Sequence, residues 1–311
     1  MKIQIKKINL KHSLIFFLFC NIFSLPFLKI NISNIQPLIC LLLILIIGVS
    51  HGSLDHIKGG KLLKIFNLNN ILIFYFTYLL IALSIIVFWI LFPVITLIFF
   101  LIVAAYHFGK EDTQFLITEN SFLNQISYFL KGSLIILAPL YFHFDETINI
   151  FKLLLVDNEN FYFILSFIED NKILNIGIIF STISSIFLFL RKFEMKKFTI
   201  FLDYFSIIIV NFYFTPLIAF TIYFCFLHSI RHSISLMFEL DHEDLNNGLL
   251  IFIKKAIPLT ILTAAFCLIS LYFLNKNYGF DSSILKLIFI GLASLTFPHI
   301  LLEYLIEKNE K

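Results

Sequence analysis

The feature that most constrains this chain is a succession of apolar runs, each long enough to cross a lipid bilayer as a helix. Hydrophobic residues make up 59% of the 311-residue sequence and charged residues only 14%, with a mean hydropathy of +0.95. A helix that crosses a bilayer needs about 20 predominantly apolar residues. The runs are continuous rather than alternating, which disfavours a membrane β-barrel. The sequence therefore predicts an all-α, polytopic membrane helical bundle that forms one domain over residues 1–311.

About ten transmembrane helices are expected from these runs. They cover residues 12–30, 36–57, 71–92, 94–110, 122–142, 173–191, 198–214, 216–238, 254–275 and 283–306. A softer segment at 150–168 is expected to be re-entrant, interfacial or outside the membrane. Lys and Arg gather in the connections that follow even-numbered helices, so the positive-inside rule predicts a multi-pass protein of the inner (cytoplasmic) membrane with a cytoplasmic N-terminus.

Net charge and cysteine spacing argue against two other classes of function. The formal net charge of +3 is too small to indicate nucleic-acid binding, and no basic patch interleaved with aromatic residues occurs. The four cysteines stand singly inside apolar runs. Without a CxxC pair, neither a thiolate metal site nor a disulfide framework is indicated.

Two histidines and an arginine stand in the middle of one strongly apolar run. His228 and His232 are four residues apart, so an α-helix projects both imidazoles from one face. Ionisable groups at membrane depth are costly and rarely face lipid, which favours a functional site inside the bundle. Such a pair suits a metal ion, and Arg231 requires a carboxylate partner. Hydrogen bonding of both rings to neighbouring helices is the alternative interpretation.

Three further histidines have the same predicted depth. His51, His107 and His299 lie, like the first pair, on even-numbered helices between mid-depth and the cytoplasmic end. Scattered structural histidines would have no reason to share a depth. The five imidazoles are therefore expected to converge on one centre.

Carboxylates follow these three histidines at the i+4 position. They are Asp55, Glu111 and Glu303, with Asp112 directly after Glu111. A carboxylate one turn away is poorly placed for the ring on its own helix, but it can bond a ring on an adjacent helix and so fix the tautomer of a metal-bound histidine. Solvated charge at the inner interface is the alternative, above all for Asp112 and Glu303.

The donor set restricts the choice of metal. Imidazoles without a thiolate suit iron, copper, zinc or nickel. Four histidines would close a zinc site, and a helical bundle has little need of a structural zinc. A six-coordinate iron would keep positions open for oxygen chemistry. Iron is therefore the preferred metal.

Four short blocks of sequence carry this set of residues. They are His51-Gly-Ser-Leu-Asp55-His56, Tyr106-His107-Phe-Gly109-Lys-Glu111-Asp112, His228-Ser-Ile-Arg-His232 and Pro298-His299. In this order they resemble the Brp/Blh-type β-carotene 15,15′-dioxygenases, bacterial and archaeal membrane proteins often associated with retinal-binding rhodopsins. The resemblance implies cleavage of the central 15,15′ double bond of β-carotene, with O2 as oxidant, into two molecules of all-trans-retinal. It also implies a functional link to such a rhodopsin.

The resemblance further implies that Fe2+ is held by His51, His107, His228 and His232. His299 is our own candidate for an additional ligand or a group that positions one. The same two roles are considered for Asp55, Glu111 and Arg231, and with less weight for His56. The remaining histidines, His12, His143 and His242, are expected to be solvated or interfacial.

An apolar carotenoid dissolves in the bilayer, where an enzyme in the same phase meets it directly. Its length is comparable with the hydrocarbon thickness of about 30 Å. Aromatic residues beside the proposed ligands are expected to line a substrate tunnel, with ordinary packing as the alternative. They are Tyr106, Phe108, Tyr223, Phe224, Phe226 and Phe297. No side chain beyond the metal centre is expected as nucleophile or general base, because iron and oxygen break the bond.

Three other kinds of protein stay open at this point. A membrane di-iron desaturase or hydroxylase acting on a lipid would use histidine boxes, but its HxxHH box is missing. A transporter or proton relay would use intramembrane His, Arg and carboxylates, although no repeated halves are evident. A haem protein would clamp its cofactor between histidines of two helices.

Overall fold

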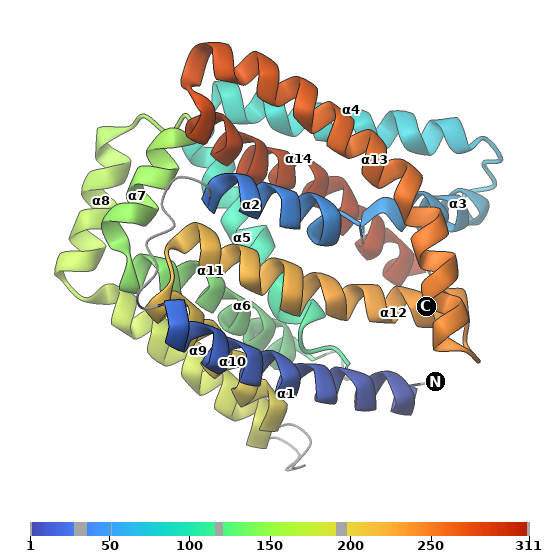
Figure 1. The fold of residues 1–311 in the computed structure, drawn as a ribbon, viewed down its shortest axis with the longest axis horizontal. Helices are drawn as coiled ribbons and strands as arrows, with labels where there is room; N and C mark the ends of the chain where they lie inside the picture. Colours follow the sequence, from blue (N-terminus) through green and yellow to red (C-terminus); the bar gives the residue numbers. More distant parts are fainter. Residues whose placement is uncertain (1, 28–35, 51, 116–120, 191–197, 310–311) are drawn as a thin grey trace.

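The computed structural model describes residues 2–27, 36–50, 52–115, 121–190 and 198–309. Within these ranges every regular element is a helix and no strand occurs, which confirms the all-α class. Most of the helices run side by side along the long axis of the molecule (Figure 1), and both chain ends lie at the same end of that axis.

Fourteen α-helices make up the described part of the chain. They are α1 (Lys2–Phe27), α2 (Gln36–Leu43), α3 (Asp55–Ile65), α4 (Ile71–Leu91), α5 (Pro93–Glu111), α6 (Phe122–Phe142), α7 (Phe144–Leu153), α8 (Glu159–Asp170), α9 (Ile173–Leu190), α10 (Thr199–Tyr213), α11 (Pro216–Ile222), α12 (Ile230–Leu240), α13 (Leu245–Tyr278) and α14 (Phe280–Asn309). Pro93 and Pro216 each stand in the first turn of a helix, where a missing N–H costs no hydrogen bond.

Seven helical segments of the described chain are long and apolar enough to cross a membrane. They are α2 to α3, α4, α5, α6, α11 to α12, α13 and α14. The bent pair of α8 and α9, which meet at 70°, gives up to eight. The expected number of about ten is therefore approximate, because it also counted α1, α9 and the short α10 as separate spans.

Two boundaries differ from the sequence prediction. α1 begins at Lys2 rather than at residue 12, so the basic N-terminal residues belong to the helix. The softer segment at 150–168 is not one element, because α7 ends at Leu153 and α8 begins at Glu159. Residues 150–168 therefore form parts of two helices joined by a short connection, and they do not form one helix across the bundle.

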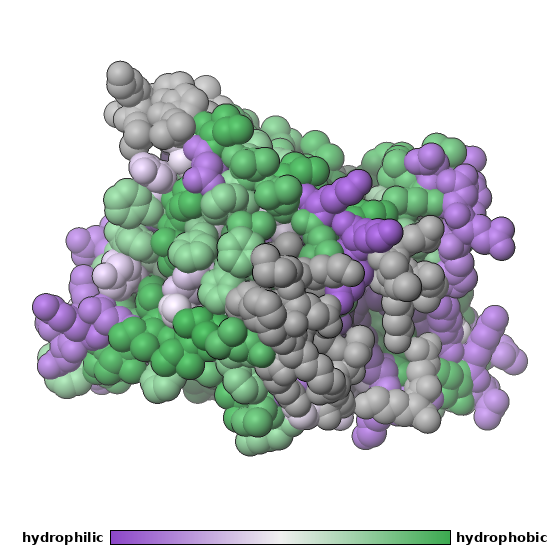
Figure 2. Space-filling view, turned by 90° about the horizontal axis from the view of Figure 1, so that it is seen from below, coloured by the Kyte–Doolittle hydropathy of each residue, from purple (hydrophilic) through white to green (hydrophobic). Residues whose placement is uncertain are grey.

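The outer surface carries the apolar residues that a lipid-facing bundle requires. Figure 2 shows hydrophobic residues in the middle of the molecule, whereas hydrophilic residues gather at the two ends of its long axis. Leu72 and Phe76 on α4, for example, are 66% and 68% exposed. So large an exposed apolar area is typical of an interaction with a membrane.

Two of the spans contain a π-helical segment, η1 (Ile44–Gly48) and η4 (Tyr223–Ser229). The two segments pack against each other, and the Ser229 hydroxyl lies 3.5 Å from the carbonyl oxygen of Gly48. Such insertions are rare and occur frequently at functional sites. η4 contains His228, so the irregular turn lies directly at one of the predicted ligands.

α5 and α6 approach closely at two glycines. A Cβ atom added to Gly109 would overlap the carbonyl oxygen of Tyr128, and one added to Gly132 would overlap that of Ala105. Small residues permit such close helix contacts in membrane proteins. The contact fixes the end of α5 that carries His107.

We expect Gly132→Ala to destabilise the protein by at least about 1–3 kcal/mol, because the new methyl group meets backbone that cannot move aside cheaply. Gly291→Ala on α14 is the matched control, since nothing lies within 4 Å of its Cβ position. The control should be neutral or more stable by up to about 1 kcal/mol. Thermal unfolding in detergent measures both, and equal melting temperatures would contradict the close contact.

Candidate metal centre

Four buried imidazoles from distant parts of the sequence meet inside the bundle. His107 lies on α5, His228 in η4, His232 on α12 and His299 on α14, and each residue is at most 6% exposed. The ring centroids of His107 and His228 are 5.3 Å apart, and those of His107 and His299 are 5.6 Å apart. The rings of His232 and His299 are separated by 5.5 Å. We call these four residues the histidine cluster. His51, the fifth predicted member, lies outside the described residues.

A carboxylate of another helix holds the ring of His299. Both oxygens of Asp55, on α3, lie 2.9 Å from Nδ1 of His299. The hydroxyl of Tyr78, on α4, donates to Asp55 Oδ2 over 2.8 Å. Asp55 therefore fixes the orientation of His299, as carboxylates commonly do for metal-bound histidines.

Two further carboxylates face rings in the same manner. Glu111 Oε2 lies 3.2 Å from Nδ1 of His232, and Asp112 Oδ1 lies 3.6 Å from Nδ1 of His228. Both carboxylates stand at the end of α5, whereas the rings belong to the η4–α12 span. The carboxylates thus serve an adjacent helix. For Asp112 the burial favours the role of a ring partner over the alternative of solvated charge, since the residue is only 4% exposed.

Two overlapping groups of donor residues are each compact enough to hold an ion, and neither group includes His228. Ligand atoms of His107, His299 and Glu303 all lie within 4.8 Å of one another, and so do those of Glu111, His232 and Glu303. Imidazole nitrogen with carboxylate oxygen suits a first-row divalent metal. The second ring nitrogens of His228, His232 and His299 face carboxylates, which leaves Nε2 as the coordinating atom. The residues therefore fit a metal such as iron.

Arg231 supports the site through an ion pair and hydrogen bonds, and it is not a metal ligand. Its guanidinium contacts both oxygens of Asp203 on α10, at 3.1 and 3.2 Å. It also donates to the Asp112 carbonyl oxygen over 3.0 Å and to the Ser13 hydroxyl over 2.8 Å. A guanidinium group has no lone pair with which to bind a metal ion. Arg231 instead connects Asp112, which faces His228, with Ser13 on α1 and Asp203 on α10.

Three of the six predicted tunnel residues lie at the histidine cluster. The ring centroids of Phe108 and His228 are 4.7 Å apart, and Phe224 stacks on His228 at 5.8 Å and 18°. The Tyr223 hydroxyl donates to Asp112 Oδ2 over 2.7 Å. Phe108 and Phe224 therefore give the site an apolar side.

The other three predicted tunnel residues contact neighbouring helices. Tyr106 donates to Gln125 on α6. Phe297 stacks on Phe99 at 5.3 Å, and Phe226 lies 5.8 Å from Phe19 on α1. In the described residues these contacts are those of ordinary packing.

The remaining histidines make other contacts. His56 Nδ1 is 2.9 Å from the Ser53 carbonyl oxygen, which ties that ring to its own turn. His12 and His143 are half-buried and lie 2.8 Å from the carbonyl oxygens of Phe226 and Asn211, so neither ring is fully solvated. Their interfacial position stays a prediction. His242 is exposed as expected.

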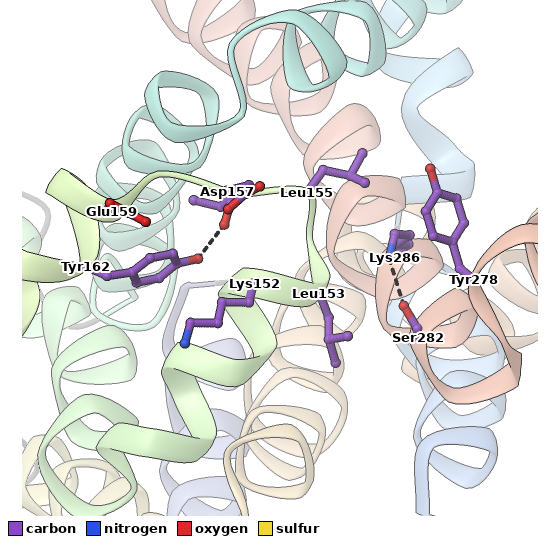
Figure 3. Close-up of a pocket in the computed structure, with 10 residues that line it drawn as sticks. Lys152, Leu153, Leu155, Asp157, Glu159, Tyr162, Tyr278, Ser282 and Lys286 are labelled. Atoms are coloured by element: carbon purple, nitrogen blue, oxygen red, sulfur yellow. Dashed lines mark hydrogen bonds between the residues drawn. The ribbon is translucent and has the colours of Figure 1, made fainter.

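A pocket of about 800 Å³ opens at the other end of the bundle (Figure 3). It lies between the α7–α8 connection and the start of α14, where Lys286 donates to Ser282 over 2.7 Å. Lys286 precedes His299 by 13 residues, a rise of about 20 Å along α14. The pocket is lined by charged residues such as Lys152, Asp157 and Glu159 and by the aliphatic residues Leu153, Leu155 and Val156. It is therefore separate from the histidine cluster.

Sequence reasoning did not single out three residues that support the site. Asp203 pairs with Arg231, Tyr78 donates to Asp55, and Lys58 lies 2.9 Å from Glu303. Asp203 carried a usable signal, because it is the sole charged residue in the apolar run 198–214. Lys58 follows the second apolar run, where the positive-inside rule alone explains a lysine, yet its side chain is only 15% exposed.

Comparisons with known proteins agree with these observations. A family model described as Beta-carotene 15,15'-dioxygenase matches residues 42–307. A curated protein of the same description, from uncultured marine bacterium 66A03, is 29% identical over 272 residues, which cover 84% of this chain and 90% of that protein. No solved structure matches. The matches confirm the resemblance carried by the four sequence blocks.

We expect Asp203→Asn to destabilise the protein by about 3–5 kcal/mol, because it removes the anion that pairs with the buried Arg231 charge. The double variant Asp203→Leu with Arg231→Met should lose less stability than Asp203→Asn, because both charges are removed together. Glu307→Gln breaks the exposed pair with Lys110 and should cost at most about 1 kcal/mol. Unfolding in detergent measures the stability of all three variants. An Asp203→Asn variant as stable as the parent would contradict the role of the Asp203–Arg231 pair.

Proposed function

The chain belongs to the β-carotene 15,15′-dioxygenase family, and from this premise we propose that its histidine cluster holds an iron ion at which the central double bond of β-carotene is cleaved. Membership of this family makes the chain a carotene-cleaving enzyme. The proposal adds that Fe2+ is the metal, that O2 is the oxidant and that the products are two molecules of all-trans-retinal.

The observation that supports this proposal best is the convergence of four buried imidazoles, three of which face a carboxylate through Nδ1. We propose His51, His107, His228 and His232 as the ligands. His299 is proposed as an additional ligand or as a group that positions one. Iron, when bound, supplies the redox chemistry by which oxygen attacks a carbon–carbon double bond. The chain supplies the position and the orientation of the rings.

The surroundings of the cluster suit a hydrocarbon substrate. Phe108 and Phe224 pack against His228, so an apolar polyene beside that ring would displace no hydrogen bonds. Specificity would then come from shape, because a carotene has no polar groups to recognise. The position of the polyene relative to the metal would determine which double bond is cleaved.

The proposed location follows from the helices and the distribution of charge. A multi-pass protein in the cytoplasmic membrane, with its N-terminus in the cytoplasm, would meet carotene in the bilayer itself. The retinal that is formed would be available to a retinal-binding rhodopsin in the same membrane. The chain would then need no soluble carrier for substrate or product.

Expression in carotene-producing bacterial cells tests the reaction. We expect the colour of the cells to fade and retinal to accumulate as the one C20 product. His107→Ala should lower retinal formation by at least roughly 10–100-fold, because it removes a ligand. His242→Ala, at an exposed position, is the control and should retain activity. Persistent colour without retinal, in cells whose membranes contain the protein, would refute the proposed function.

Metal analysis of the purified protein separates the remaining alternatives. We expect one iron per chain, and removal of iron by a chelator should abolish cleavage until Fe2+ is restored. Two irons per chain would instead indicate a di-iron desaturase or hydroxylase. A Soret band would indicate haem, and the absence of any tightly bound metal would favour a transporter or proton relay.

A further inference from the structure

One carboxylate of the site differs from the others in the ring nitrogens that it faces. Oε1 of Glu303, on α14, lies 3.6 Å from Nε2 of His232 and 3.7 Å from Nε2 of His299. Asp55, Glu111 and Asp112 face Nδ1 atoms instead. Since those Nδ1 atoms face carboxylates, Nε2 is the atom left for the metal. Glu303 is therefore on the metal side of the rings.

Glu303 is also the residue that the two groups of potential ligands share. One group combines it with His107 and His299, and the other with Glu111 and His232. An ion bound to the Glu303 carboxylate would therefore lie within reach of donors from either group. The side chain is 14% exposed, so its charge is only partly screened by solvent.

A cation already occupies the same oxygen. Nζ of Lys58, on α3, lies 2.9 Å from Glu303 Oε1. A divalent ion among neutral imidazoles would attract this carboxylate, and the lysine would compete with the ion for it. The two interactions oppose each other, because a carboxylate oxygen drawn toward the metal weakens its contact with the ammonium group.

On the basis of the proposed function, we propose that Glu303 is an anionic ligand of the metal and that Lys58 competes with the metal for its carboxylate. The ligand set thereby gains one negative charge, which favours retention of a divalent ion in a low-dielectric site. A second ion pair joins α5 to α14, since Lys110 Nζ lies 2.7 Å from the carboxylate of Glu307, one turn after Glu303. It provides a matched comparison in the same helix.

Titration of the metal-depleted, detergent-purified protein with Co2+ tests this proposal. The readouts are the dissociation constant and the visible absorption spectrum of the bound ion, which depends on the ligands. Glu303→Gln should weaken Co2+ binding by roughly 10–100-fold and change the spectrum. Glu303→Asp, which retains the charge, should restore part of the affinity. Glu307→Gln should alter neither readout.

Lys58→Met distinguishes a ligand from a mere ion-pair partner. If Glu303 binds the metal, removal of its competitor should leave the affinity for Co2+ equal or higher. If the ion pair only holds α3 against α14, Lys58→Met and Glu303→Gln should weaken binding alike, and the spectrum should stay the same. That outcome would overturn the proposal.

Different results of the Co2+ titration would refute the role of Glu303 and the proposed function. Parent protein that binds Co2+, with a Glu303→Gln variant of equal affinity and identical spectrum, would remove Glu303 from the ligand set and leave the iron enzyme intact. Parent protein that binds neither Co2+ nor Fe2+ would refute both. A folded state of each variant is established beforehand by its helical circular dichroism and melting temperature.

Discussion

The interior of this bundle depends on the pairing of imidazoles with carboxylates from other helices. Polar and charged groups are expensive in an apolar interior unless a partner satisfies them. Asp55 ties α3 to His299 on α14, and Glu111 ties the end of α5 to His232 on α12. Arg231 extends the network to Asp203 on α10. The same contacts therefore assemble the histidine cluster and hold together helices that are far apart in the sequence.

Backbone irregularities set where these rings lie. In a regular α-helix, His228 and His232 would point from one face toward a common neighbour. His228 lies in the π-helical turn η4 and faces His107, whereas His232 lies on α12 and faces His299. The glycine contact between α5 and α6 acts on the same site, because Gly109 allows α5 to approach α6 two residues after His107. Local departures from ideal helix geometry thus position the donors.

The sequence predicted those features that depend on local pattern. Apolar runs predicted the helical spans, and the i+4 spacing of His and carboxylate predicted that Asp55 and Glu111 would serve rings of adjacent helices. The partner of each carboxylate could not be predicted, because Asp55 and His299 are 244 positions apart and only the packing of α3 on α14 joins them. The same holds for Asp203 with Arg231. The start of α1 was misjudged because its lysines interrupt an apolar run without interrupting the helix.

The distribution of polar groups around the cluster indicates the direction from which a hydrocarbon could approach. Asp112 and Arg231 form a buried polar network behind His228, and Lys58 with Glu303 adds a second charged group beside His232 and His299. Phe108 and Phe224 cover another side of His228 with aromatic carbon. An apolar polyene on the first side would face charged groups that it cannot satisfy, whereas on the second side it would face aromatic carbon. A carotene is therefore expected to reach the proposed metal site across Phe108 and Phe224, while the charged side orients the imidazoles.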